Sequence, residues 1–102
     1  MHIHFERTGG FAGLRLIATV HTESLSPEEA RELHEMVDAA GFFDLPAALT
    51  TARPGADRFQ YRLTVESGAR QHTIETNDGS APQALQPLLR RLTAIARSPS
   101  AS

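Results

Sequence analysis

The residues His34, Glu35 and Asp38 come closest in this chain to a catalytic motif. A zinc-protease helix carries two histidines four positions apart with a catalytic glutamate after the first. Here Asp38 occupies the position of the second histidine. Glu35 and Asp38 also fall on the polar face of an ordinary amphipathic helix. A solvated helix face is therefore the favoured interpretation, rather than a metal site.

The remaining histidines indicate no second catalytic centre. His2 and His4 project from one face of a predicted strand and could chelate a metal, but the sequence identifies no third ligand. We interpret His21 as a strand-end residue and His72 as a half-buried structural one. The chain has no cysteine and no lysine, no serine in a nucleophile elbow and no phosphate-binding glycine loop. The sequence thus predicts a protein that is not an enzyme and has no cofactor or metal of its own.

Two loop aspartates, Asp57 and Asp78, are the carboxylates of most chemical interest. Asp57 follows Pro54 and Gly55, where an aspartate commonly bonds to its own turn backbone. The alternative is an exposed carboxylate presented to a partner, since a carboxylate oxygen is a competent zinc ligand and catalytic zinc keeps one position open for water. Asp78 competes for this role, although its loop also suits the lead-in to a helix.

A glycine-rich segment, Arg7-Thr8-Gly9-Gly10-Phe11-Ala12-Gly13, separates two apolar runs. Gly-Gly supplies the positive φ angles that tight hairpins require. Phe11 would then be offered at the tip of the turn, as an anchor for a partner's pocket. The other interpretation is that Phe11 folds back and caps the core at the end of the sheet. The sequence leaves both open and slightly favours the cap.

The elements that must position these residues follow the order ββαββα. Alternating apolar residues predict strands and a 3.6-residue period predicts helices. The strands are expected at 2–6, 14–21, 58–65 and 71–76, and the helices at 27–40 and 85–95. We predict a single two-layer α+β domain over residues 1–97, with a four-stranded, mostly antiparallel sheet and two helices on one face. Residues 98–102 are expected to form a disordered tail.

Local signals fix several boundaries. Ser26 and Glu29 form a capping box at the start of the first helix, and Gly41 is a natural stop. Pro87 either kinks the second helix or marks its regular start after a looser turn. Arg62 and Glu75 could pair across two strands. The predicted core residues are Leu16, Val20, Leu33, Val37, Phe59, Tyr61, Leu63, Leu88, Leu89 and Leu92.

Tracing the chain direction through this order brings three connections to one end of the sheet. These are the segments 9–13, 44–57 and 77–81. A connection as long as 44–57 in so small a domain is either functional or mobile. We therefore predict that Phe11, Asp57 and Asp78 share one binding edge.

The bulk composition excludes several classes of partner. At 102 residues with 40% hydrophobic and 22% charged residues, the chain fits one soluble domain. A net charge of −2 gives no attraction to nucleic acid or anionic membranes, and no run approaches the ~18 apolar residues of a membrane span. Without a signal peptide at its start, the chain is expected to be cytoplasmic. We expect a monomer when it is free.

Several segments of the chain, taken in their order and spacing, resemble the emfourin family of bacterial protein inhibitors of protealysin-like metalloproteases. The resemblance runs from the glycine segment through 26–30, 41–46 and 55–61 to 72–74, 81–82 and 87–89, and covers roughly residues 3 to 97. It implies an α+β inhibitor that blocks a thermolysin-family active site, with a loop aspartate near the target's zinc and a hydrophobic loop in its substrate subsites. The protease-binding residues inferred for this chain are Gly10, Phe11, Ala12, Leu14, Asp57, Arg58 and Asp78.

Two other functions stay open from the sequence. A general interaction or regulatory domain could use the same loop end on another partner. A small metal-dependent enzyme built on His2, His4 or His34 is the remote third possibility.

Overall fold

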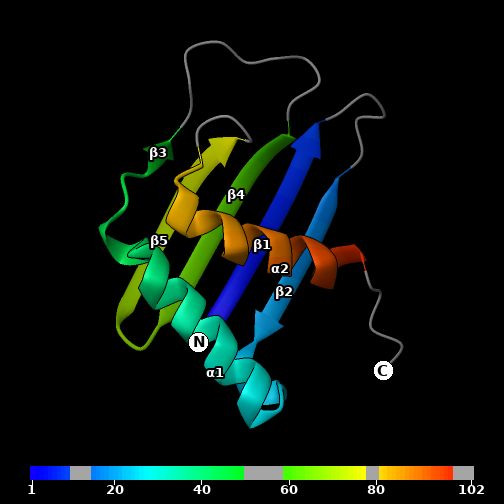
Figure 1. Ribbon diagram of the computed structural model, residues 1–102, viewed down its shortest axis with the longest axis vertical. Helices are drawn as coiled ribbons and strands as arrows, with labels where there is room; N and C mark the ends of the chain where they lie inside the picture. Colours follow the sequence, from blue (N-terminus) through cyan, green and yellow to red (C-terminus); the bar gives the residue numbers. More distant parts are fainter. Residues whose placement is uncertain (10–14, 50–58, 78–80, 98–102) are drawn as a thin grey trace.

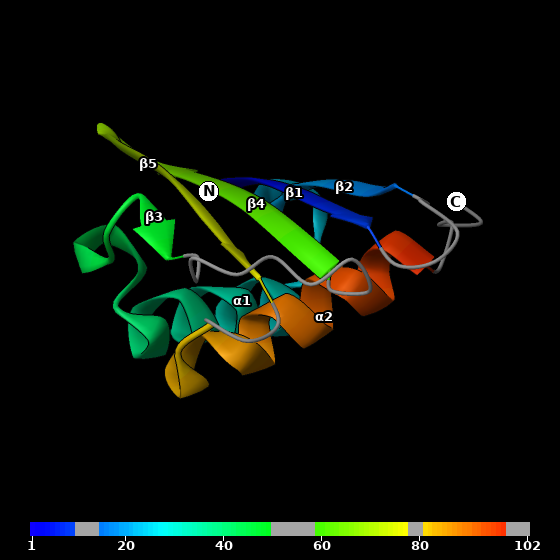
Figure 2. The same cartoon turned by 90° about the horizontal axis from the view of Figure 1, so that it is seen from above.

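The protein is a two-layer α+β structure in which one twisted sheet covers two helices (Figures 1 and 2). The computed structural model describes residues 1–9, 15–49, 59–77 and 81–97, and the statements below concern these residues. Both helices lie on the same face of the sheet, as the sequence predicts (Figure 2). No described helix lies on the opposite face of the sheet, which we call the open face (Figure 2).

Five strands form the sheet in the order β2-β1-β4-β5-β3. The four long strands are antiparallel to their neighbours. Their bounds are His2–Gly9 for β1, Leu16–His21 for β2, Phe59–Ser67 for β4 and Arg70–Asn77 for β5. The prediction of a mostly antiparallel sheet is therefore confirmed for these four strands, but it missed a fifth strand at one edge of the sheet.

The fifth strand, β3 (Ala48–Leu49), runs parallel to β5 at that edge. It is held by the Glu75 backbone N–H, which donates to the Ala47 carbonyl at 2.8 Å, and by the Thr76 hydroxyl, which donates to the Leu49 carbonyl at 2.8 Å. A two-residue strand is too short to show an alternating pattern, so it could not be predicted from the sequence.

Helix α1 (Pro27–Ala40) begins and ends where its local signals predict. The Ser26 hydroxyl oxygen accepts a hydrogen bond from the Glu29 backbone N–H at 3.2 Å and donates one to the Glu29 carboxylate at 3.0 Å. Pro27 occupies the first turn, where a missing N–H costs nothing. Gly41 ends the helix at φ 59°, a left-handed conformation that favours glycine.

Helix α2 (Gln86–Arg97) follows a short 3-10 helix, η3 (Gln83–Leu85). Pro87 is thus the second residue of α2, where the N–H of an ordinary residue would have no partner inside the helix. Of the two alternatives for Pro87, the regular start after a looser turn is correct.

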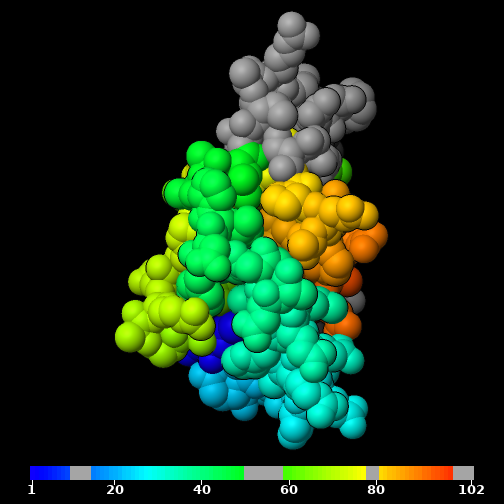
Figure 3. All heavy atoms as spheres, turned by 60° about the vertical axis from the view of Figure 1, so that its left-hand side comes forward, coloured from blue at the N-terminus to red at the C-terminus, as the bar shows by residue number. Residues whose placement is uncertain are grey.

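Two further 3-10 helices frame α1, namely η1 (Thr22–Ser24) and η2 (Phe42–Asp44). Phe42 is 1% exposed and its ring meets the His72 ring of β5 edge-on at 5.5 Å. His72 Nε2 also lies 2.6 Å from the Leu45 carbonyl, which joins β5 to the segment after α1. Seen from the side in Figure 3, α1 and the η2–β3 segment form one continuous surface.

The core lies between the sheet and the helices. Its fully buried members are Ile3, Phe5, Leu33, Val37, Phe42, Leu63, Val65, Ile74, Leu85, Leu88 and Leu92. Seven of the ten predicted core residues are buried: Val20, Leu33, Val37, Leu63, Leu88, Leu89 and Leu92.

The other three predicted core residues, Leu16, Phe59 and Tyr61, are only half-buried. Each points to the helix face of the sheet, as alternation predicts. However, α2 crosses the strands at mid-length, and these three residues lie beyond it, toward one end of the sheet (Figure 1). Alternation predicts the face of a strand residue but not how far the covering layer extends.

Candidate functional site

Four strand ends meet at one end of the sheet, which we call the loop edge and define by Gly9, Leu49, Phe59 and Asn77. Gly9, the last residue of β1, pairs with Phe59, the first of β4. Gln60 pairs with Asn77, the last residue of β5, and Leu49 of β3 pairs with Thr76. The ends that flank residues 10–14, 50–58 and 78–80 are therefore neighbours in the sheet, as predicted from the chain direction.

The residues predicted to contact a partner lie outside the described residues. These are Gly10, Phe11, Ala12, Leu14, Asp57, Arg58 and Asp78. Their roles therefore remain predictions, as does the choice between an anchor and a cap for Phe11. The disordered tail predicted for 98–102 also lies outside the described residues.

The described border of the loop edge is held by specific contacts. The Arg7 guanidinium carbon lies 4.0 Å from the centre of the Phe59 ring, a cation–π contact between β1 and β4. On the other side, Asn77 and Thr76 are each 1% exposed. The Asn77 carbonyl accepts a hydrogen bond from the Ala81 N–H at 3.0 Å, which ties the end of β5 to the lead-in of η3.

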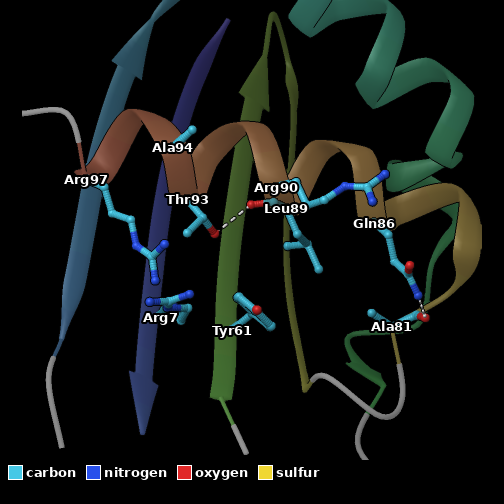
Figure 4. A pocket seen from close by; sticks show the side chains of 9 residues that line it. All are labelled: Arg7, Tyr61, Ala81, Gln86, Leu89, Arg90, Thr93, Ala94 and Arg97. Carbon is cyan, nitrogen blue, oxygen red and sulfur yellow. Dashed lines mark hydrogen bonds between the residues drawn. The ribbon is translucent and has the colours of Figure 1, made fainter. Parts of the chain in front are cut away.

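A cavity of about 620 Å³ opens between α2 and this end of the sheet (Figure 4). The sheet contributes Arg7 and Tyr61 to its wall, and α2 contributes Leu89, Thr93 and Arg97. The Thr93 hydroxyl is occupied, because it donates to the Leu89 carbonyl at 2.8 Å. The cavity therefore combines a partly apolar wall with guanidinium groups.

The open face of the sheet is polar and offers no comparable apolar surface. Arg62 and Glu75 pair across β4 and β5 at 3.5 Å, as predicted, and Arg15 pairs with Glu6 at 3.3 Å. Ile17, at 49%, is the exposed large hydrophobic residue found within the described segments. This face does not resemble a hydrophobic docking surface.

The histidine-based alternatives find no support in the described part of the chain. His34, Glu35 and Asp38 are all exposed on α1. His4 lies beside the Thr19 hydroxyl at 3.2 Å on the open face. Among the described residues, no group of three or more histidines and carboxylates is arranged to hold a metal ion. His72 is half-buried and bonded to backbone, the structural role that the sequence predicts.

A small ionic cluster lies at the opposite end of the sheet around Glu23. The Glu23 carboxylate is 3.8 Å from the Met1 ammonium and 3.4 Å from His2 Nε2. The pKa of Glu23 is lowered from 4.5, first by a hydrogen bond from its own backbone N–H and then by attraction to the ammonium, His2 and His21. The His2 and His21 rings meet edge-on at 4.3 Å.

Comparison with known proteins assigns the family. The family model for emfourin matches residues 5–93, which is most of the chain. This chain therefore belongs to the emfourin family, as the sequence resemblance indicates. Membership implies the function of a protease inhibitor, and hence a protease as partner rather than a catalytic role for this chain. No curated protein and no solved structure matches the sequence. No helix within the described segments is long and apolar enough to cross a membrane.

Sequence reasoning missed the cavity and its arginines. A signal was present, because Arg7 shares the strand parity of Ile3 and Phe5, which point to the helix layer. An arginine at an inward-facing strand position, where an apolar residue is expected, indicates that the apolar core ends near that residue. Arg97 gave no such signal, since a basic residue in the last turn of a helix is common.

Proposed function

We propose that this chain inhibits zinc metalloproteases of the thermolysin family, protealysin-like enzymes among them, by entering the active-site cleft with its loop edge. The observation that carries the proposal is the register of β1, β4 and β5. It makes Gly9 and Phe59 direct partners and puts Asn77 beside them, opposite Gln60. Three chain segments thus start from one edge of the sheet. We infer that segments which start side by side can enter one cleft together.

Covalent geometry supports a joint action of Phe11 and Asp57. Phe11 follows Gly9 by two residues and Asp57 precedes Phe59 by two. Paired strand residues are at most about 5.5 Å apart, and two residues of chain reach about 7 Å. The two Cα atoms can therefore be no more than roughly 20 Å apart. Asp78 follows Asn77 directly and starts from the same edge.

The proposed chemistry divides two tasks between these residues. The Asp57 carboxylate approaches the catalytic zinc of the target and takes the place of its water. Phe11, with Leu14 as the second candidate, fills an apolar subsite beside the scissile bond. Gly10, Ala12 and Arg58 flank these two groups and contact the walls of the cleft. Asp78 is the alternative zinc-directed carboxylate.

The test is an inhibition assay with purified chain against thermolysin and a protealysin-like enzyme, read by peptide cleavage. Asp57→Ala and Phe11→Ala should each weaken inhibition at least about thirtyfold, since truncation of a central anchor costs about 2 kcal/mol or more. Glu35→Ala, exposed on α1, is the matched control and should change nothing. Melting temperatures should stay at the wild-type value for Asp57→Ala and Phe11→Ala.

Three results would redirect the proposal. If Phe11→Ala unfolds the domain while inhibition per folded molecule is kept, Phe11 caps the core. If Asp78→Ala abolishes inhibition and Asp57→Ala does not, the loop edge is right and the carboxylate is Asp78. If neither enzyme is inhibited at any concentration, the chain acts on another class of partner through these loops.

A further inference from the structure

The cavity beneath α2 carries an unusual concentration of positive charge. Three arginines line it, Arg7 from β1 and Arg90 and Arg97 from α2, and its described lining contains no aspartate or glutamate. The chain as a whole has a net charge of −2. The cavity is therefore a local reversal of the overall charge.

Among the described arginines, these three belong to the group that forms no ion pair, together with Arg31 and Arg70. Arg15, Arg62 and Arg91 each lie within 4 Å of a glutamate carboxylate. Within the described segments, no ion pair is formed by Arg7, Arg90 or Arg97. A guanidinium is always charged and carries five N–H donors in a planar fork, so it readily accepts an anion as partner.

Two of the guanidinium groups converge. Figure 4 shows the Arg97 side chain reaching down from α2 toward Arg7, beside the ring of Tyr61. Arg7 is half-buried and is held in place by its contact with the Phe59 ring at 4.0 Å. The helix dipole favours a cation in the last turn of α2, but it does not require Arg97 to turn toward a second cation. Two like charges that approach each other repel, and an anion bound between them offsets this repulsion by its attraction to both.

We propose that Arg7 and Arg97 form an anion-binding site that takes the carboxylate or phosphate group of a small organic anion or of an acidic side chain. Two guanidinium forks from different elements can each bind such a group through paired N–H donors. The volume of about 620 Å³ exceeds the needs of a bare ion and falls in the range of small-molecule sites. Leu89 and Ala94 supply an apolar wall for the body of the ligand. None of the described residues that line this site is among the loop residues named in the proposed inhibitory mechanism.

The direct test is an NMR titration of the full, isotope-labelled chain with inorganic phosphate and with phenyl phosphate, at constant ionic strength set by sodium chloride. The Arg7 and Arg97 side-chain signals should shift and saturate. Arg97→Gln should weaken binding about tenfold, the equivalent of about 1.4 kcal/mol, because one charge-assisted fork is lost. Arg97→Lys should restore part of the affinity, since it keeps the charge but loses the planar fork.

Arg62→Gln is the matched control, because Arg62 is an exposed arginine on the open face of the sheet. It should bind both probes as the wild type does. Arg7→Gln tests the sheet side of the cavity in the same titration, and its melting temperature shows whether the variant is folded. Shifts that never saturate with either probe would overturn the proposal. So would equal affinities of Arg97→Gln and Arg62→Gln.

A second experiment separates the two sources of the anion. The inhibition assay is repeated with the tighter probe present and with Arg97→Gln. If the site receives an acidic side chain of the protease, both changes weaken inhibition. If it receives a free organic anion, the probe binds and inhibition is unchanged. The titration contains no protease, so its result stands or falls independently of the proposed inhibitory function.

Discussion

The substitution Thr76→Val tests whether β3 is an anchor of the loop edge. The Thr76 hydroxyl is 1% exposed and donates to the Leu49 carbonyl at 2.8 Å, at the point where the chain enters residues 50–58. Valine has nearly the same shape and favours strands, so the main loss is this hydrogen bond. A buried acceptor left without its donor costs about 1–3 kcal/mol. Leu49 is only half-buried and water can reach it in part, so we expect about 1–2 kcal/mol.

Urea unfolding and thermal melting measure the effect. A loss of this size lowers the melting temperature of a domain this small by roughly 5–10 °C. Thr19→Val is the matched control, because Thr19 is exposed on the open face and its hydroxyl lies 3.2 Å from the ring of His4. It should stay within about 0.5 kcal/mol of wild type. Inhibition should also weaken in Thr76→Val, by less than in Asp57→Ala. An unchanged melting curve for Thr76→Val would refute the role of β3 as an anchor.

Two further predictions concern the ends of elements. Ser26→Ala removes the cap that accepts a hydrogen bond from the Glu29 N–H, so it should lower the unfolding free energy by about 1 kcal/mol in urea titration. Ser24→Ala, at an exposed position of η1, should have little effect. Glu23→Gln should melt below wild type at neutral pH. Because the pKa of Glu23 is lower in the folded state than the unfolded pKa of 4.5, the ionised carboxylate stabilises the fold. This stabilisation is complete at pH values above 4.5 and is lost as the pH falls through the pKa of the folded state. The gap between the two melting curves should therefore close in acid, and a constant gap would contradict the assignment.

The sequence predicted the elements whose limits are set locally. Helix α1 lies between a serine cap and a left-handed glycine, and both signals act within one turn of the helix. The β4–β5 hairpin turns at Gly68, whose φ of 61° again favours glycine. In both cases the residue that ends the element lies at the boundary itself. Such signals can be found without knowledge of the rest of the chain.

Features that depend on distant partners were missed. Strand β3 exists because Thr76 and the backbone of β5 bind a two-residue segment 27 positions away in sequence. The half-burial of Tyr61 depends on where α2 crosses the sheet. The convergence of Arg7 and Arg97 joins the first strand to the last helix. No local sequence pattern predicts these long-range contacts. Arg7 is a partial exception, because its position in the alternation of β1 directs it toward the helix layer and the cavity.

The register also shows how burial changes along the strands toward the loop edge. Phe5, Leu63 and Ile74 pair across three strands and are fully buried. Phe59 and Tyr61 lie two and one inward-facing positions nearer the loop edge, each step being about 7 Å, and they are half-buried. Burial thus falls away over a short distance toward the edge. We therefore expect substitutions beyond that edge to remove little buried area and to change partner binding far more than the free energy of unfolding. A loop-edge variant that lost both together would show that the core extends into the loops.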